Sequence, residues 1–515
     1  MKRMALIHPV LYTFIAVFYL YLPVSKSISP FEMLRPLGGM LILLVFVALV
    51  LLKTVKNTNE AGVYLSLFVF AFYFERSVFE LVFPVMIAIL LIYFLFKRIQ
   101  KRQANFKEVN IVLGLLGFAL FLSGVVKFVQ LLADIDMAYY QQLSALEKQP
   151  LLTELNVQRD ENPDIYYLIL DGYGRADILN ELYGFDNSAF IDELNARGFV
   201  VPELVRSNYP QTVFSVSSTL NMDYFQSFAP GLDDSHLWWL LEPYVDESQT
   251  RLLLEEMDYQ SVSFAVNWTV TDNHKTDIYY SPEKINVSEF ENYLLSNTLL
   301  KMFIPLIDRI AYVPASYDAH RELINYTLDT LPNIANLPGD YFVYAHLLAF
   351  HPPFVFDENG SPINRDGKFS LNNDENYSGE TERIEKYIHG YVGQMKYLNK
   401  RILEMVDEIV ERSSTPPIII LQADHGPGMY VDFASIENTC LHERFSPFVA
   451  YYFPGVDEKT VPDDITLVNT FRVVFNEYFD ANLPLLQNQY YFGETPRYPY
   501  RMQELDLKQI DQVCQ

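Results

Sequence analysis

Two apolar runs that end in acidic residues decide the fold: YYLILDGYGR at residues 166–175 and PIIILQADHG at residues 417–426. Each begins with bulky aliphatic or aromatic residues, which is typical of a strand buried on both faces. Each then reaches a polar side chain and a glycine, which permits a sharp turn. An α/β fold places its active site at the carboxyl ends of such strands, so Asp171, Asp424 and His425 are the first candidates for chemistry.

Further strands are predicted around these two, alternating with amphipathic helical stretches. The predicted strands are Asp164–Leu170, Gly198–Val201, Ser261–Val266, Tyr341–Leu347, Ile418–Gln422 and Phe448–Phe453. The clearest helix is Thr381–Glu411, in which apolar residues recur at spacings of three or four. This alternation implies an α/β domain with a mainly parallel central sheet and helices on both faces.

The first quarter of the chain has a different character, with long apolar runs that carry few charges. These runs are Ala5–Tyr21, Met40–Leu52, Ala61–Phe74, Val78–Phe96 and Ile111–Leu132. Several approach the roughly 20 residues that span a bilayer, so we predict five transmembrane helices within residues 1–132. One alternative joins the third and fourth runs into a single broken helix, which would invert the topology of everything after them. Another is a cleaved signal peptide in the first run, although no small-residue cleavage site is evident.

The placement of Lys and Arg favours five spans. With five spans, the basic residues at positions 2–3, 53–56 and 97–107 all fall on one side of the membrane, which is the positive-inside pattern. Everything after Leu132 then lies outside the cytoplasm. We therefore expect a multi-pass protein of the cell (inner) membrane, with residues 133–162 as an interfacial connector and residues 163–515 as an extracytoplasmic catalytic domain.

The charge is divided unevenly along the chain. The net charge is −26 over 515 residues, yet residues 1–132 carry 13 Lys and Arg against 5 Asp and Glu. The outer domain is therefore strongly acidic and would repel polyanions, so nucleic acid is not an expected partner. Only two cysteines occur, Cys440 and Cys514, so no disulfide framework stabilises this domain, and a single bridge between them is left open.

Each strand end also has a structural explanation. Asp171 could be a turn residue, because Asp-Gly is common in turns. Asp424 and His425 form an oxygen and nitrogen pairing typical of zinc or manganese sites. Both can face one ion only if the chain turns there, which Gly426 allows. The alternative is a hydrogen-bonded Asp beside a surface His.

A third feature is the hydroxyl-rich stretch SNYPQTVFSVSS at residues 207–218. A hydroxyl nucleophile needs activation by an adjacent base or a metal. Taken alone, hydroxyls of this kind more often satisfy the backbone at the start of a helix.

Together, the three features resemble the alkaline phosphatase superfamily. The order of a strand ending in Asp171, a Thr at a helix head, a His-Pro loop and a strand ending in Asp424-His425-Gly426 resembles its sulfatase-like branch. With the five preceding spans, the chain is most similar to membrane-anchored members such as lipoteichoic acid synthases and lipid A phosphoethanolamine transferases. The resemblance implies an alkaline-phosphatase-like (sulfatase-like) domain in residues 163–515.

The same resemblance implies one divalent metal ion bound by Asp171, Thr212, Asp424 and His425. Manganese or zinc is expected rather than magnesium or calcium. Thr212 is the implied nucleophile, because the sequence TVFS that begins there resembles the Thr-x-x-Ser of the transferases. Ser215 is the fallback nucleophile.

Further residues correspond to phosphate-holding histidines of the family. They are His351 in FHPPF and His442 in LHERFSPF. His346 lies within a predicted strand and is interpreted as a core histidine. Arg444 could contact a phosphoryl oxygen or pair with a carboxylate such as Glu443.

Two departures from the family limit the expected activity. Neither Cys-x-Pro-x-Arg nor Ser-x-Pro-x-Arg occurs near Thr212, so the formylglycine nucleophile of true sulfatases is absent. No Asp-x-x-x-His lies mid-chain, so one metal is expected rather than two.

The sequence thus predicts a membrane-anchored, metal-dependent phosphotransferase that acts on envelope lipids or glycans through a covalent phospho-threonine. The lipid bilayer and a lipid-linked or glycan substrate are the expected partners. One alternative is a sulfatase-like hydrolase of phosphate or sulfate esters outside the cell. Another is a non-catalytic envelope assembly protein, against which the joint retention of Asp171, Thr212, Asp424 and His425 argues.

Overall fold

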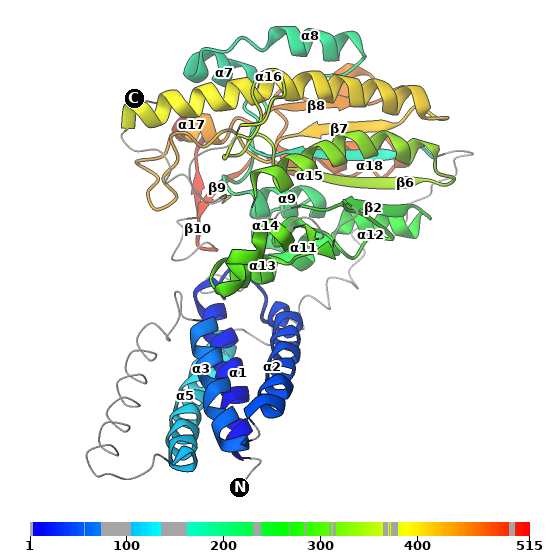
Figure 1. Ribbon diagram of the computed structural model, residues 1–515. Coiled ribbons are helices and arrows are strands. Elements are labelled where there is room, and N and C mark those ends of the chain that lie inside the picture. Colours follow the sequence, from blue (N-terminus) through cyan, green and yellow to red (C-terminus); the bar gives the residue numbers. More distant parts are fainter. Residues whose placement is uncertain are drawn as a thin grey trace. The chain divides into compact units, whose positions relative to one another are not determined.

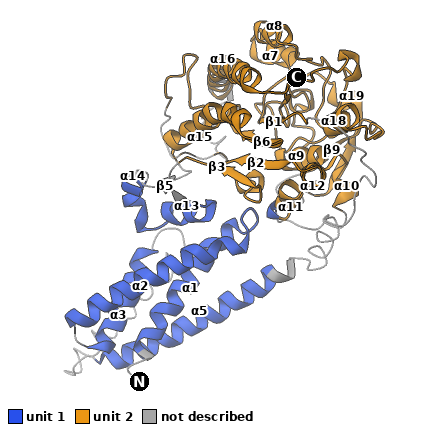
Figure 2. Cartoon of the chain, turned by 90° about the vertical axis from the view of Figure 1, so that its right-hand side faces the viewer, with its two compact units in different colours: residues 1–136, 237–239, 284–314 blue, residues 137–236, 240–283, 315–515 orange. Residues whose placement is uncertain are grey.

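The chain divides into two compact units in the computed structural model (Figure 2). Unit 1 comprises residues 1–136, 237–239 and 284–314, and unit 2 comprises residues 137–236, 240–283 and 315–515. The structure describes residues 4–55, 57–73, 105–134, 162–229, 238–266, 268–282, 285–307, 311–312, 316–363, 369, 371, 380–493 and 500–514.

Unit 2 is built on a six-stranded sheet with the strand order β3-β2-β6-β1-β7-β8 (Figure 1). The strands are β1 (Ile165–Leu170), β2 (Gln260–Phe264), β3 (Ile278–Tyr280), β6 (Tyr341–Leu347), β7 (Ile418–Gln422) and β8 (Val449–Tyr452). Neighbouring strands are parallel except for β7 and β8, which are antiparallel. The predicted α/β domain with a mainly parallel sheet is therefore confirmed.

Both faces of the sheet are covered, because successive side chains of a strand point to opposite sides. In β1, Tyr166, Leu168 and Leu170 belong to one core, whereas Ile165, Tyr167 and Ile169 belong to the other. The first core includes residues of α7 (Ala176–Tyr183), α8 (Ser188–Ala196), α15 (Tyr317–Thr330) and α16 (Glu380–Arg412). The second includes residues of α9 (Thr212–Asn221), α12 (Gln249–Glu256) and α18 (Thr470–Phe479). The helix predicted at Thr381–Glu411 is α16.

The structure differs from the prediction at Gly198–Val201, which is not a strand of the sheet. Gly198 has a φ of +87° and makes a left-handed turn directly after α8. Only Val200 makes a single antiparallel bridge, to Tyr451. The predicted strand fails because this turn precedes it and Pro202, which has no amide hydrogen, follows it. By contrast, β3 was not predicted.

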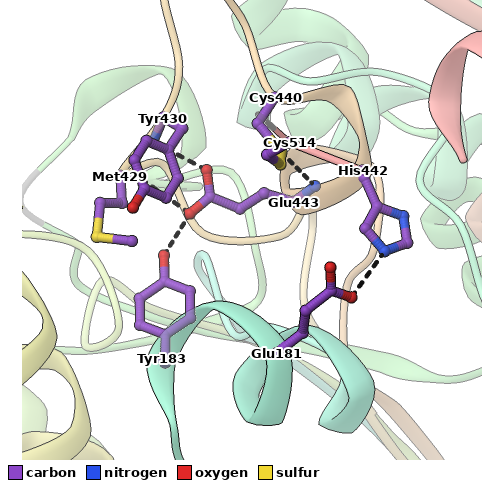
Figure 3. Close-up of a disulfide and its surroundings, with 8 residues drawn as sticks. All are labelled: Glu181, Tyr183, Met429, Tyr430, Cys440, His442, Glu443 and Cys514. Carbon is purple, nitrogen blue, oxygen red and sulfur yellow. Dashed lines mark hydrogen bonds and ion pairs between the residues drawn. A yellow bond between two sulfur atoms is a disulfide. The ribbon is translucent and has the colours of Figure 1, made fainter. Parts of the chain in front are cut away.

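Unit 2 also contains shorter elements. They are α10 (Phe225–Phe228), α11 (Glu242–Asp246), η5 (Thr269–Thr271), η7 (Leu331–Asn336), α17 (Leu441–Arg444), η9 (Glu458–Thr460), η10 (Leu467–Asn469), the antiparallel pair β9 (Tyr490–Gly493) and β10 (Met502–Leu505), and α19 (Leu507–Ile510). The short helix η4 (Trp238–Leu241) lies where the chain passes from unit 1 to unit 2. A disulfide joins Cys440 to Cys514, and so ties the end of the chain to the residue before α17 (Figure 3).

Unit 1 contains the apolar helices of the N-terminal quarter. They are η1 (Met4–Leu6), α1 (Ile7–Tyr21), η2 (Leu22–Val24), η3 (Pro30–Met33), α2 (Leu34–Val55), α3 (Thr58–Phe72) and α5 (Phe106–Asp134). Among the described residues, three stretches are long and apolar enough to cross a membrane: Ile7–Val24, Pro30–Val55 and Phe106–Leu131.

The predicted number of five spans is not decided by these helices. The third predicted run corresponds to α3, whose 15 residues are fewer than the 18 of the shortest membrane-length stretch, Ile7–Val24. The fourth run, Val78–Phe96, and most of the connector at residues 133–162 lie outside the described residues. Five spans therefore stay a prediction.

A polar contact joins three helices of unit 1. His8 of α1 lies with its Nδ1 2.7 Å from the Ser66 hydroxyl of α3 and its Nε2 2.6 Å from Asn110 Oδ1 of α5. The helices also approach closely at Gly62, where an added Cβ would lie 2.0 Å from the Ala5 carbonyl oxygen. Small residues and buried hydrogen bonds of this kind hold helices together where apolar burial alone would not.

A later segment of the chain completes unit 1. It contains β4 (Ile285–Asn286), α13 (Glu289–Ser296), η6 (Leu299–Phe303), α14 (Ile304–Ile307) and β5 (Ala311–Tyr312), and β4 pairs with β5 in parallel. The chain therefore leaves unit 2 after β3 and returns to it before α15.

Candidate active site

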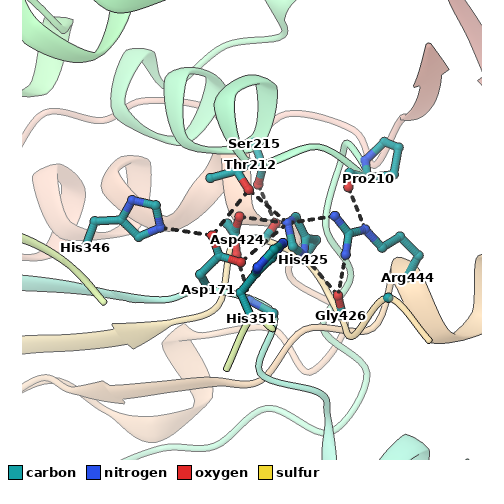
Figure 4. Close-up of polar contacts among 12 residues, drawn as sticks. Asp171, Pro210, Thr212, Ser215, His346, His351, Asp424, His425, Gly426 and Arg444 are labelled. Carbon is teal, nitrogen blue, oxygen red and sulfur yellow. Dashed lines mark hydrogen bonds and ion pairs between the residues drawn. The ribbon is translucent and has the colours of Figure 1, made fainter. Parts of the chain in front are cut away.

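The carboxyl ends of β1 and β7 bring three ligand-type side chains together. Asp171 follows β1, and Asp424 and His425 follow β7, which is the neighbour of β1. One ligand atom from each of the three lies within 4.8 Å of the others, and all three residues are buried (Figure 4). The cluster expected at this edge of the sheet is therefore present.

The turn at Gly426 allows both Asp424 and His425 to face this cluster. A Cβ at Gly426 would lie 2.0 Å from the Glu443 carbonyl oxygen, so only glycine fits there. Its amide donates a hydrogen bond to the Arg444 carbonyl at 2.8 Å. The glycine thus lets the chain turn against the segment that carries Arg444.

The tautomer of His425 is set by the hydrogen bond at its Nδ1 atom. Its Nδ1 lies 2.9 Å from the Gly426 carbonyl oxygen, which can only accept, so Nδ1 carries the proton. The Nε2 atom then presents a lone pair. This nitrogen lies 3.0 Å from Asp424 Oδ2 and 3.9 Å from Asp171 Oδ1.

Those two carboxylate oxygens are buried and lack a hydrogen-bond partner among the described residues. An unpaired buried carboxylate oxygen is costly unless a cation or a donor satisfies it. Burial raises the pKa of Asp424, but its interactions with His425, His346 and Thr212 outweigh burial and hold that pKa below its usual value. Asp424 is therefore ionised, and two carboxylates with one imidazole lone pair form a donor set that fits a divalent metal ion.

Thr212 lies beside this donor set. Its hydroxyl is 3.0 Å from His425 Nε2 and 3.5 Å from Asp171 Oδ2 (Figure 4). Thr212 is the first residue of α9, whose amide end favours negative charge. Ser215, one turn later, instead donates to the Asp424 backbone carbonyl at 2.6 Å. The structure thus brings together Asp171, Thr212, Asp424 and His425.

Arg444 brings a positive charge to the same place. Its Nη2 lies 2.8 Å from His425 Nε2, and it donates through Nε to Pro210 O at 2.6 Å and through Nη1 to Gly426 O at 3.2 Å. Burial lowers the pKa of Arg444, but an arginine remains charged at neutral pH. No described carboxylate lies within ion-pair distance of its guanidinium group. The charge is available for an anionic substrate group.

Glu443 does not pair with Arg444. Its carboxylate accepts hydrogen bonds from the Tyr183 hydroxyl, from the Met429 amide at 3.2 Å and from the Tyr430 amide at 2.9 Å (Figure 3). Burial raises the pKa of Glu443. Its role is to hold the segment after β7 to the segment before Arg444.

His346 is a member of the site that sequence reasoning missed. Its Nε2 lies 3.2 Å from Asp171 Oδ2, and its Nδ1 lies 2.8 Å from the Thr271 hydroxyl (Figure 4). The parallel register pairs His346 with Ile169, two residues before Asp171. His346 is buried as predicted, but it also orients a candidate ligand, and only the strand register reveals this.

The two other predicted histidines lie in different places. His351 lies on the loop after β6, with its Nδ1 2.6 Å from the Pro352 carbonyl oxygen. This loop is close to the cluster, because a Cβ added at Gly172 would lie 3.3 Å from Phe350 O and 4.0 Å from His425 Cε1. Figure 4 draws His351 beside Asp171 and His425.

His442 is directed at Glu181, whose Oε2 lies 3.6 Å from its Nε2 (Figure 3). The residue of this segment that contacts His425 is Arg444. We therefore assign no phosphate contact to His442.

Comparison with known proteins gives structural matches only. No protein-family model matches the sequence, and no curated protein sequence matches it either. The structure is similar to the C-terminal periplasmic domain of EptC from Escherichia coli in complex with zinc, with 13% identity over 69% of this chain and 96% of that chain and a TM-score of 0.43.

It is also similar to the integral membrane protein lipooligosaccharide phosphoethanolamine transferase A (EptA) from Neisseria meningitidis, with 11% identity over 73% of this chain and 70% of that chain and a TM-score of 0.38. A third match is the 2-O glycosaminoglycan sulfatase BT1596, with 13% identity over 63% of this chain and 72% of that chain and a TM-score of 0.36. By their names, the second match is a transferase and the third is a sulfatase. With TM-scores below 0.5, the function has to be argued from the geometry of this chain.

Proposed function

We propose that the protein is a membrane-anchored, metal-dependent phosphotransferase that acts on envelope lipids or glycans through a covalent phospho-threonine at Thr212. Unit 1 anchors the chain in the cell (inner) membrane by five spans, and unit 2 works on the extracytoplasmic side. Water takes the place of the acceptor in the alternative, hydrolytic reaction.

One observation carries the proposal: a threonine hydroxyl at a helix amino end lies beside an imidazole nitrogen and the Asp171 carboxylate, in a cluster that also holds two unsatisfied carboxylate oxygens. The distances from Thr212 Oγ1 are 3.0 Å to His425 Nε2 and 3.5 Å to Asp171 Oδ2. A structural threonine in a buried position needs only one hydrogen-bond partner. This arrangement instead suits a hydroxyl that loses its proton and attacks a phosphorus atom as a nucleophile.

Asp171, Asp424, His425 and Thr212 would hold the metal ion, with manganese or zinc expected from the mixed oxygen and nitrogen donors. When bound, a divalent cation supplies positive charge that favours the deprotonated hydroxyl and offsets the charge of the phosphoryl group. His346 contributes by holding Asp171 through the 3.2 Å contact.

In the first step, Thr212 Oγ forms a bond to phosphorus while the bond from phosphorus to the donor oxygen breaks. The hydroxyl proton passes from Thr212 to the Asp171 carboxylate, and the departing donor alcohol takes up a proton from solvent. In the second step an acceptor hydroxyl attacks phosphorus and releases its proton to solvent, the bond to Thr212 Oγ breaks, and Asp171 returns the proton to Thr212. Arg444 faces the charge on the phosphoryl oxygens throughout, because its guanidinium has no carboxylate partner among the described residues.

The test compares two Thr→Ala variants of the same helix in the full chain. Thr212→Ala should abolish turnover and leave the fold intact. Thr219→Ala, two turns later in α9, is the matched control, because that hydroxyl accepts a hydrogen bond from Gln422 Nε2 at 3.4 Å and is not part of the Asp171, Asp424 and His425 cluster. The measurement is release and transfer of label from a headgroup-labelled phospholipid in detergent solution. Full activity of Thr212→Ala would refute the proposal.

The products distinguish transfer from hydrolysis. Label found on an added glycan or lipid acceptor indicates transferase activity, whereas label found only in free phosphate or phosphoalcohol indicates hydrolysis. A Thr219→Ala variant that is as inactive as Thr212→Ala would show that the effect comes from the helix and not from the nucleophile.

A further inference from the structure

A short helical segment from the middle of the sequence belongs to unit 1. The segment consists of α13, η6 and α14, and it is fixed to the ends of α1 and α2 (Figure 2). Arg35 forms an ion pair with Glu291, and the Phe290 amide donates to the Glu32 carboxylate at 3.4 Å. The Phe290 ring packs edge-on against Tyr21, with 5.7 Å between the ring centroids. These contacts hold the amino end of α13 at the junction between η2 and η3.

The same segment exposes a stripe of large apolar side chains. These are Leu299, Met302 and Phe303 of the 3-10 helix η6 and Leu306 of α14. Their exposed fractions are 43%, 71%, 52% and 60%. Lys301 is the only charged residue between positions 299 and 307. Four large apolar side chains exposed within eight residues mark a contact surface and are not typical of a water-facing segment.

We propose that the face formed by Leu299, Met302, Phe303 and Leu306, here called the apolar stripe, inserts into the headgroup region of the lipid bilayer. The protein then has a second membrane attachment that lies in the plane of the interface, in addition to its spanning helices. This inference rests on the proposed membrane location and not on the chemistry at Thr212.

The position of the segment within unit 1 identifies lipid as the occupant. If the stretches Ile7–Val24 and Pro30–Val55 cross the bilayer, the junction between them lies at one membrane surface. The contacts of Phe290 and Glu291 fix α13 at that junction. Phe31 and Leu34, at the same end of α2, are also 72% and 64% exposed. The apolar stripe therefore continues an apolar surface that already belongs to lipid.

Charge placement in the sequence gives the side of the membrane. The junction after α1 lies opposite to Lys2, Arg3, Lys53 and Lys56, so it is on the outer surface under the positive-inside pattern. The apolar stripe would thus contact the outer leaflet. Because the chain enters this segment after β3 and leaves it before α15, the attachment adds two chain connections between unit 2 and the membrane-embedded unit.

A depth measurement on the full chain in vesicles tests the proposal. Cys440 and Cys514 are bonded to each other, so an environment-sensitive fluorophore can be placed on a single added thiol, Phe303→Cys. Leu507→Cys is the matched control, since Leu507 is 45% exposed and lies in unit 2. The vesicles contain phosphatidylcholine and phosphatidylglycerol, with and without a nitroxide on the acyl chain.

Quenching by the lipid nitroxide should be several-fold stronger at position 303 than at position 507, and quenching by aqueous iodide should show the opposite order. Equal lipid quenching at both positions would overturn the proposal. Protection of position 303 from both quenchers would also overturn it, because the stripe would then be covered by protein, such as a second copy of this chain.

An activity measurement separates this proposal from the proposed function. Met302→Glu should lower the rate with a lipid-borne donor in vesicles several-fold and leave the rate with a water-soluble phosphodiester unchanged. Leu507→Glu should change neither rate. If the unaltered protein turns over neither substrate, the proposed function fails, whereas the quenching result still decides the membrane contact.

Discussion

Asp424 and Glu443 are two completely buried carboxyl groups of unit 2 whose pKa values shift in opposite directions. Burial raises the pKa of Glu443, whose oxygens accept hydrogen bonds from Tyr183, Met429 and Tyr430. Burial also acts on Asp424, but its interactions with His425, His346 and Thr212 outweigh burial and lower its pKa. Asp424 Oδ2 nevertheless lacks a hydrogen-bond partner among the described residues.

The difference teaches how to separate a structural acid from a functional one. A buried carboxyl group whose hydrogen bonds are all made contributes to the fold, because nothing further has to bind to satisfy it. A buried carboxylate that is ionised and unpaired is costly in the free protein and gains a partner when a cation binds. Glu443 is of the first kind, and Asp424 is of the second.

The largest effect should follow from Asp424→Asn. The amide can keep the hydrogen bond from the Gly172 amide at 3.2 Å but lacks the charge that holds a divalent ion. Bound metal should fall from one ion per chain to a trace, and turnover should fall by at least about a thousandfold. Elemental analysis of the purified protein and an initial-rate assay check both. Glu443→Gln is the control and should keep its metal. Equal metal loss in the two variants would contradict the distinction between a functional Asp424 and a structural Glu443.

The next largest effect should follow from Arg444→Lys, which keeps the positive charge but loses the planar fork of donors. We expect kcat/KM to fall by about a hundredfold with metal content unchanged. Arg472→Lys is the matched control, because Arg472 is also buried and donates only to backbone carbonyls, those of Met222 at 2.7 Å and Pro484 at 2.8 Å. The Arg472→Lys substitution should lower the melting temperature but leave kcat/KM unchanged. An equal fall of kcat/KM in both variants would contradict the role given to Arg444.

The smallest effect on catalysis, and a clear effect on stability, should follow from changes at Glu443. Glu443→Ala leaves the donors of Tyr183, Met429 and Tyr430 without an acceptor, which should cost about 2–4 kcal/mol of unfolding free energy. Glu443→Gln keeps an acceptor and should be milder. Chemical unfolding of the detergent-solubilised protein, followed by fluorescence, measures both variants.

The pH dependence at Glu443 has a definite sign. Its folded-state pKa is raised above the ordinary value of 4.5, so the folded state binds the proton more tightly than the unfolded state. The stability from this group is fully present below pH 4.5 and is lost as the pH rises through the folded-state pKa. The stability of Glu443→Gln relative to the unaltered protein should therefore increase from pH 4.5 upward. The opposite slope would show that the folded-state pKa of Glu443 lies below its ordinary value.

The sequence predicts the part of the site that lies on strands well, because an uninterrupted apolar run shows where a buried strand ends. Asp171, Asp424 and His425 follow β1 and β7 directly, and adjacent parallel strands end at the same edge. Thr212 could be selected only through the resemblance of its TVFS sequence, since Ser215 and several other hydroxyls are as close in sequence. The structure distinguishes them by the partners of each hydroxyl.

The loop-borne part could not be predicted in the same way. The sequence LHERFSPF does not indicate which side chain points toward the metal-ligand cluster. In the structure Arg444 contacts His425, whereas His442 lies beside Glu181. His346 was assigned to the core because strand alternation does not show its neighbour. The register that sets it beside β1 depends on the pairing of strands far apart in the sequence.

The segment at residues 289–307 also has a recognisable pattern in the sequence. The spacing of Leu299, Met302, Phe303 and Leu306 is visible in the sequence, but it is shorter than the apolar runs that indicate a span. Only its packing against Tyr21 and Arg35 assigns it to the unit of the apolar helices.

The most direct test of the central claim is to trap the covalent adduct. The full chain is mixed with headgroup-labelled phospholipid, quenched in acid within the first turnover and mapped by peptide mass spectrometry. We predict one phosphoryl-linked adduct on Thr212, none on Ser215, and no adduct at all in Thr212→Ala. Turnover by the unaltered protein without an adduct, or an adduct on another residue, would contradict the account.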